Sequence, residues 1–147
     1  MTTRVAADAE GIVIFILLDN VDVVAAVDDR IGTELDLTKP ESLPALRIST
    51  VSTRSIARRQ LDGVSVQLEA WHNSRIEAKD LLELARGALL EDGLEGHYPG
   101  LGVLSGIDDG TGPLPRPDPE TDTARWLCTV VVYCHPAPAG SDGSSGS

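Results

Sequence analysis

The stretch that decides the fold is "VSVQLEAWHNSRIEAKDLLELARGALL", which runs from Val64 to Leu90. Apolar residues occupy every second position of its first part, as in a strand with one buried face: they are Val64, Val66, Leu68 and Ala70. The later apolar residues recur at helical spacing: they are Ala78, Leu81, Leu82, Ala85, Ala88 and Leu89. The sequence therefore predicts a strand that leads directly into an amphipathic helix.

This helix has a start signal and a stop signal. Ser74 and Glu77 form a capping box, in which the hydroxyl and the carboxylate bind each other's free backbone amides. Gly93 follows the last turn and is typical of a helix end. The predicted helix is therefore bounded on both sides.

Trp71 and His72 mark the joint between the strand and the helix. Strand alternation sends the two side chains to opposite faces, which argues against an acid–base site built with the nearby Glu69. A ring at the end of a strand commonly seats the helix that follows. The sequence favours this packing role over a reactive site.

Other elements are predicted on both sides of this unit. Helices are expected over Ala6 to Leu18, where alanine and acid content outweigh a β-branched run, and over Asp22 to Val27. Further strands are expected over Ala45 to Ser52, Gly102 to Asp108 and Thr123 to His135. Residues 32–44 and the proline-rich segment 109–120 are expected to be irregular.

The predicted last strand, "TARWLCTVVVYCH", is apolar on both sides. One face carries Trp126 and Cys128, and the other carries Tyr133 together with Arg125. Such a strand is either central in its sheet or turns its second face toward another subunit.

The predicted fold class is α+β. We expect one domain over residues 1–136, with a mainly antiparallel or mixed sheet of about four strands. An N-terminal helix and one long amphipathic helix pack on one face. Residues 137–147 are expected to form a flexible Gly/Ser-rich tail, which is either native or an added remnant.

Composition limits the possible functions. The 147 residues suffice for a core without disulfides or metal, and the net charge of −11 opposes tight binding to phosphate backbones and anionic membranes. The apolar run from Ile12 to Leu18 is too short to span a membrane, and acids precede it where a signal peptide carries positive charge.

Charge is unevenly distributed along the chain. Residues 46–60 contain four arginines and no acid, and they connect two predicted strands as a basic hairpin. Arg54, Arg58 and Arg59 are either a solvated loop or a contact for an acidic protein surface.

The two cysteines, Cys128 and Cys134, are expected to be free thiols in a reducing compartment. Six residues of strand separate them by about 20 Å, whereas a disulfide needs Cα atoms within about 7 Å. Burial in the middle of a strand should raise the thiol pKa of Cys128 and make it a poor nucleophile. No residue spacing indicates a metal site or a cofactor.

The assembled order resembles the tail terminator (tail completion) proteins of long-tailed bacteriophages. The features that carry the resemblance are "DDRIG" at residues 28–32, "LPALRISTVS" at 43–52, "VSVQLEAW" running into "SRIEAKDLLELARGAL", and "DTARWLCTVVVYCH". The resemblance covers residues 7–136. The long proline-rich segment and the Gly/Ser tail depart from the family pattern.

The resemblance implies a non-enzymatic virion protein of the tail or neck, assembled in the host cytoplasm. It implies a ring, usually of six copies, that caps the tail tube, ends its polymerisation and meets the head connector. DNA would pass through an acidic lumen without specific binding. The expected assembly surface comprises Arg54, Arg58, Arg59, Arg125 and Tyr133.

Two alternatives stay open at this stage. The first is another neck component, such as a head–tail stopper. The second is a small enzyme that uses Cys128 or His72.

Overall fold

The computed structural model describes residues 4–5, 7–37, 42–57 and 61–138. Its helices are α1 (Ala9–Leu18), α2 (Val21–Val27) and α3 (Arg75–Asp92). Its strands are β1 (Arg4–Val5), β2 (Ile31–Gly32), β3 (Ala45–Ala57), β4 (Leu61–His72), β5 (Gly96–Tyr98), β6 (Gly102–Asp109), β7 (Leu114–Pro115), β8 (Ala124–His135) and β9 (Ala137–Pro138).

The main sheet has the strand order β2-β3-β4-β8-β6-β5, and β7 pairs with β8 beyond the end of β6. All pairs are antiparallel except β2 with β3. The prediction of an α+β domain is confirmed. The predicted number of about four strands is wrong, because β2, β5 and β7 are two- or three-residue strands that have no periodicity to detect.

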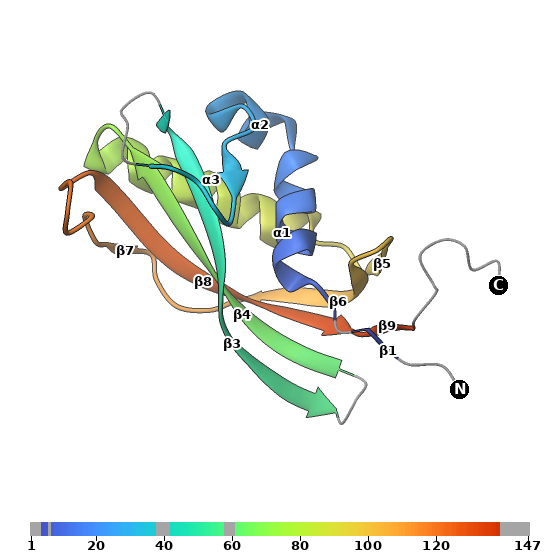
Figure 1. The fold of residues 1–147 in the computed structure, drawn as a ribbon. Coiled ribbons are helices and arrows are strands. Elements are labelled where there is room, and N and C mark those ends of the chain that lie inside the picture. Colours follow the sequence, from blue (N-terminus) through green and yellow to red (C-terminus); the bar gives the residue numbers. More distant parts are fainter. Residues whose placement is uncertain (1–3, 6, 38–41, 58–60, 139–147) are drawn as a thin grey trace.

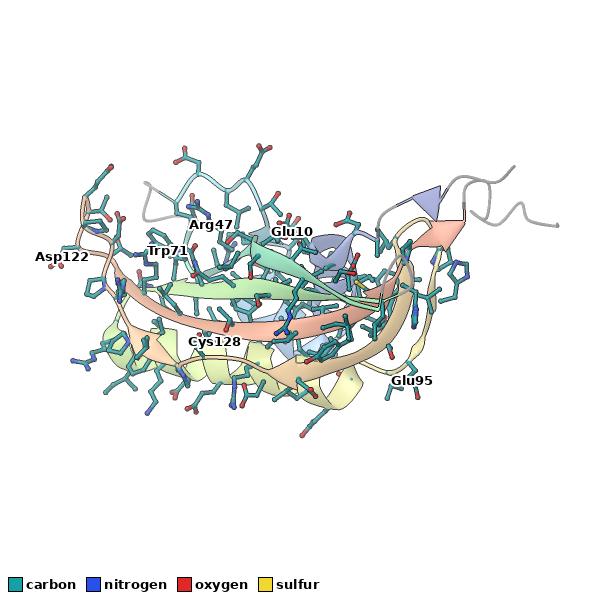
Figure 2. All side chains as sticks on the ribbon, turned by 90° about the horizontal axis from the view of Figure 1, so that it is seen from below. Glu10, Arg47, Trp71, Glu95, Asp122 and Cys128 are labelled. Carbon is teal, nitrogen blue, oxygen red and sulfur yellow. The ribbon has the colours of Figure 1, made fainter. Side chains whose placement is uncertain are left out.

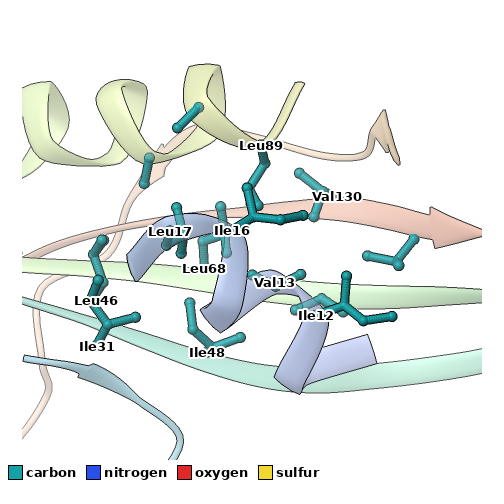
Figure 3. Close-up of a cluster of buried hydrophobic side chains, with 14 of the residues drawn as sticks. Ile12, Val13, Ile16, Leu17, Ile31, Leu46, Ile48, Leu68, Leu89 and Val130 are labelled. Carbon is teal, nitrogen blue, oxygen red and sulfur yellow. The ribbon is translucent and has the colours of Figure 1, made fainter. Parts of the chain in front are cut away.

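The three helices cover one face of the sheet (Figure 1). α1 lies between α3 and β3, and it contacts both. Figure 3 shows Ile12, Ile16 and Leu17 of α1 among core side chains of the sheet and of α3. This single apolar layer explains how a chain with few aromatic residues builds its core.

α1 is a helix, as predicted, but it begins at Ala9 instead of Ala6. The Asp8 side chain accepts a hydrogen bond from the Gly11 amide and caps the first turn. Burial of Ile12 and Val13 outweighs the weak helix propensity of β-branched residues, since tertiary packing provides most helical stability.

The β3–β4 hairpin is longer than the sequence indicates. The strands predicted over residues 45–52 and 64–70 extend to 45–57 and 61–72. Arg54 therefore lies in β3 opposite Gly63, instead of in a connecting loop. The polar residues that hid this extension belong to the part of β3 that is exposed.

Trp71 is a buried packing residue, as predicted, but it does not seat α3. It pairs with Ala45 and packs with Leu37 on the sheet face opposite the helices. Trp126 takes the predicted role on the helix side, where Arg75 and Lys79 of α3 lie 5.7 and 5.5 Å from its ring.

Regular structure also appears in two places where none was expected. Segment 109–120 contains β7, which pairs Leu114 with Leu127. β9 pairs Ala137 with Val5 of β1, inside the segment predicted to be a flexible tail. The rest of that tail, residues 139–147, lies outside the described residues.

Candidate functional site

We call the sheet face that is turned away from the helices the outer face. Figure 2 looks onto it and labels Arg47 and Trp71. Alternation along β4 sends Gln67, Glu69 and Trp71 to this face, because the residues between them belong to the core. The pairing register then places Arg47 beside Glu69 and Arg125 beside Trp71.

Glu69 is a buried carboxylate at the centre of the outer face, and its residue is 4 % exposed. One oxygen accepts hydrogen bonds from Trp71 Nε1 at 3.1 Å and from Arg125 Nη1 at 3.4 Å. The other accepts one from Gln67 Nε2 at 3.1 Å and lies 4.0 Å from Arg47 Nε. A buried carboxylate persists only when it is paired in this way, so the cluster holds three strands together.

Arg125 is engaged within its own chain. Its guanidinium carbon lies 5.2 Å from the Trp71 ring centroid, and its Nε donates a hydrogen bond to the Arg116 carbonyl at 2.9 Å. Together with the contact to Glu69, these interactions leave its side chain 16 % exposed. The proposed contact of Arg125 with another subunit stays a prediction.

Arg54 and Tyr133 lie together on the outer face, on either side of Gly63. A Cβ atom on Gly63 would lie 3.3 Å from Tyr133 Cε1 and 3.4 Å from Ile56 Cδ1. The glycine therefore lets Tyr133 and Ile56 close over the strand. Arg58 and Arg59, the other predicted interface residues, lie outside the described residues.

We define the hairpin end as Val51, Arg54, Ile56 and Tyr133. Val51 is 58 % exposed and Ile56 is 50 % exposed, although both are large apolar residues. Arg54 is exposed as well. The hairpin end thus combines apolar surface with positive charge.

A second apolar surface lies on the helices and was not identified from the sequence. We define the helix patch as Phe15, Leu18, Val21, Leu94 and Tyr98. Their exposed fractions are 52 % for Phe15, 43 % for Leu18, 78 % for Val21 and 69 % for Leu94. The helical periodicity of 9–18 offered a signal, because Phe15 and Leu18 fall outside its buried stripe.

Contacts between elements hold the helix patch together. The rings of Phe15 and Tyr98 meet edge to face with centroids 5.6 Å apart. The Tyr98 hydroxyl donates a hydrogen bond to the Leu94 carbonyl at 3.2 Å. Asn20 at the start of α2 donates one to Asp92 at the end of α3, at 2.8 Å.

His72 is the last residue of β4, and its ring faces the start of α3. Its Nδ1 accepts a hydrogen bond from the Asn73 amide at 2.8 Å, and its Nε2 lies 3.8 Å from a Glu77 carboxylate oxygen. The Ser74 hydroxyl accepts a hydrogen bond from the Glu77 amide, as the predicted capping box requires, but the Glu77 carboxylate accepts from the Ser74 hydroxyl instead of from its backbone amide. A pocket of about 440 Å³ opens beside these residues, and Asp122 and Leu37 contribute to its wall.

The two thiols are free, as predicted, and both are buried. Burial raises the pKa of Cys128 to about 12 and that of Cys134 to about 11. Cys128 is therefore almost wholly a thiol at neutral pH, which makes it a poor nucleophile.

Because an unfolded thiol has a pKa of about 8.5, we expect iodoacetamide at pH 8 to alkylate the folded protein more slowly than the protein in urea, by roughly two thousandfold at Cys128 and roughly two hundredfold at Cys134. Mass spectrometry over time measures both rates. Because folding raises these pKa values, their contribution to stability is complete below about pH 8.5 and is lost as the pH rises toward 11 and 12. Rapid alkylation of Cys128 in the folded protein would contradict this expectation.

The described residues lack two features. They contain no group of three or more His, Cys, Asp or Glu side chains placed to hold a metal ion. None of their helices is both long and apolar enough to cross a membrane.

Comparisons with known proteins give one informative result. No family model matches the sequence, and no curated protein matches it significantly. Among solved structures, the chain is similar to one from the virion of a native gene transfer agent particle, with a TM-score of 0.65 and 14 % identity. The match covers 86 % of this chain and 94 % of the other, so the two share a fold over almost their whole length.

Proposed function

We propose that this protein is a structural component of a phage-like virion. The observation that carries the proposal is the fold shared with a chain of the gene transfer agent virion. The match covers 94 % of that chain. The two exposed apolar surfaces support it, because large exposed apolar patches mark protein interfaces.

More specifically, we propose a tail terminator. Copies of the chain form a ring on the tip of the tail tube, stop its polymerisation and offer a surface to the head connector. The sequence resemblance supports this role. The net charge of −11 also suits a lumen through which DNA passes without sticking.

Electron microscopy of the purified protein tests this role. We expect closed rings, alone or after mixing with the tail tube protein of the same genome, and tubes that stop growing when the protein is added. Solitary subunits that leave tube length unchanged at all concentrations would contradict the proposal. A ring that binds the head connector but not the tube would favour a head–tail stopper.

We further propose that the protein is not an enzyme. The raised thiol pKa of Cys128 and the capping contacts of His72 support this. Cys128→Ser and His72→Gln should therefore assemble like the unchanged protein. Loss of a measured catalytic turnover in either variant, with assembly intact, would favour the enzyme alternative.

A further inference from the structure

Exposed acids stand beside the helix-patch residues in the sequence, and we call them the acidic rim. They are Asp19, Asp22, Glu91, Asp92 and Glu95. Neither α1 nor α3 carries a basic residue in its last turn. These exposed carboxylates repel one another in the isolated subunit, although Asp92 also accepts a hydrogen bond from Asn20. A positively charged partner would relieve that repulsion.

The hairpin end has the complementary character. It offers Val51 and Ile56 as apolar contacts beside Arg54, and Arg58 and Arg59 follow in the sequence. In Figure 1 the far end of the β3–β4 hairpin points to the bottom of the view, whereas α2 and the end of α1 lie at the top. The far end of the hairpin and the α1–α2 part of the helix patch therefore lie at opposite ends of the molecule and do not meet within one subunit.

The structure of β3 indicates how this hairpin makes contact. Along the outer edge of β3, β2 pairs only with residues 46 and 47. Further along β3, the Thr50 amide donates a hydrogen bond to the Glu10 side chain of α1. Register shifts follow between Thr50 and Ser52 and between Ser55 and Ala57. Such irregularities disfavour strand addition to an edge, so contact through side chains is expected.

We propose that the hairpin end of one copy of this chain docks on the helix patch of a second copy. Val51 and Ile56 would cover Phe15 and Leu18, and Arg54 would face the acidic rim. An apolar centre with a charged rim is the usual anatomy of a protein interface. Opposite charge on the two sides orients the subunits and speeds their encounter.

This interface is heterologous, because each copy uses two different surfaces. Repeated by rotation, a heterologous contact closes into a ring, whereas a two-fold contact produces only a dimer. The inference rests on the proposed ring function and adds to it the surfaces through which the copies join.

The first variants reverse the charge of one surface at a time in the full chain. The hairpin variant carries Arg54→Glu, Arg58→Glu and Arg59→Glu, and the patch variant carries Asp19→Lys, Glu91→Lys and Glu95→Lys. Each should self-associate at least about tenfold more weakly than the unchanged protein, because like charges then face each other. Sedimentation velocity measures the association, and circular dichroism verifies folding.

Mixing the two variants gives the decisive result. The reversed hairpin of one variant is complementary to the reversed patch of the other, and the remaining pair of surfaces is unchanged. Rings that alternate the two variants should therefore form, with association within about threefold of the unchanged protein. A single chain that carries all six reversals should assemble equally well.

A matched control carries Arg75→Glu, Lys79→Glu and Arg116→Glu. It has the same net charge as the hairpin variant, but the substitutions lie outside both surfaces. It should assemble like the unchanged protein. If the unchanged protein forms rings and the hairpin variant does too, or if mixing restores nothing, this interface is wrong and the ring function stands. If the unchanged protein forms no ring alone or with tube protein, both proposals fail.

Discussion

Replacing Glu69 by alanine is expected to lower the free energy of unfolding by about 3 kcal/mol. Removal of one partner from a buried ion pair typically costs about 3–5 kcal/mol, and the low end applies because the Arg47 side chain is 43 % exposed. Without the carboxylate, the Arg125 guanidinium and the Trp71 indole lose their common acceptor. Urea unfolding should show a midpoint lowered by more than about 1 M with an unchanged slope.

Two further variants separate charge from volume. Glu69→Gln keeps the size and one carbonyl acceptor, so it should cost less than Glu69→Ala. Gln67→Ala removes one donor to the same carboxylate from a position that is only partly buried, and it should cost about 1 kcal/mol. A loss near zero for Glu69→Gln would mean that the charge of Glu69 contributes nothing.

A double-mutant cycle tests whether Glu69 and Arg125 act as a unit. Arg125→Met keeps much of the stacking on Trp71 and removes the charge. We expect a coupling energy of about 1–3 kcal/mol between the two positions, since they share a hydrogen bond in a partly buried cluster. Additive losses would contradict the cluster as described.

The strongly periodic parts of the fold could be predicted from the sequence. The strand from Val64 and the helix from Arg75 to Asp92 have apolar residues at the spacing of each structure, and the helix also has its caps. The short strands could not be predicted in this way. β2 and β7 form because β3 and β8 offer free edges beside them, which is a property of the tertiary structure.

The candidate surfaces were only partly predictable for a related reason. The arginines of residues 46–60 stand out as a run of one charge, and so the basic hairpin was identified. The residues of the helix patch are far apart in the sequence, between positions 15 and 98, and only the fold brings α1, α2, α3 and β5 together. No local pattern marks such a surface.

The role of Glu69 shows the same limit. Its position on the face of β4 away from the core gives no sign in the sequence that it is buried. Burial arises because Arg47, Arg125 and Trp71 surround it from neighbouring strands. A sequence pattern gives the face of a residue, but only the strand pairing gives its neighbours.

Leu82→Ala is expected to lower the free energy of unfolding by about 2–5 kcal/mol. Leu82 of α3 is fully buried, so its loss removes transfer free energy and leaves a cavity beneath the helix. For a chain of this size, each kcal/mol lowers the melting temperature by about 2–4 °C. Differential scanning calorimetry should therefore record a decrease of roughly 4–20 °C.

Ile76→Ala is the matched control, because it changes a large apolar residue to alanine in the same helix. Ile76 is 74 % exposed, and alanine has the higher helix propensity, so stability should change by less than about 0.5 kcal/mol. A similar loss in both variants would mean that α3 does not pack as described. Because Leu82 belongs to neither the hairpin end nor the helix patch, rings of Leu82→Ala should still form below its melting temperature, which separates stability from assembly.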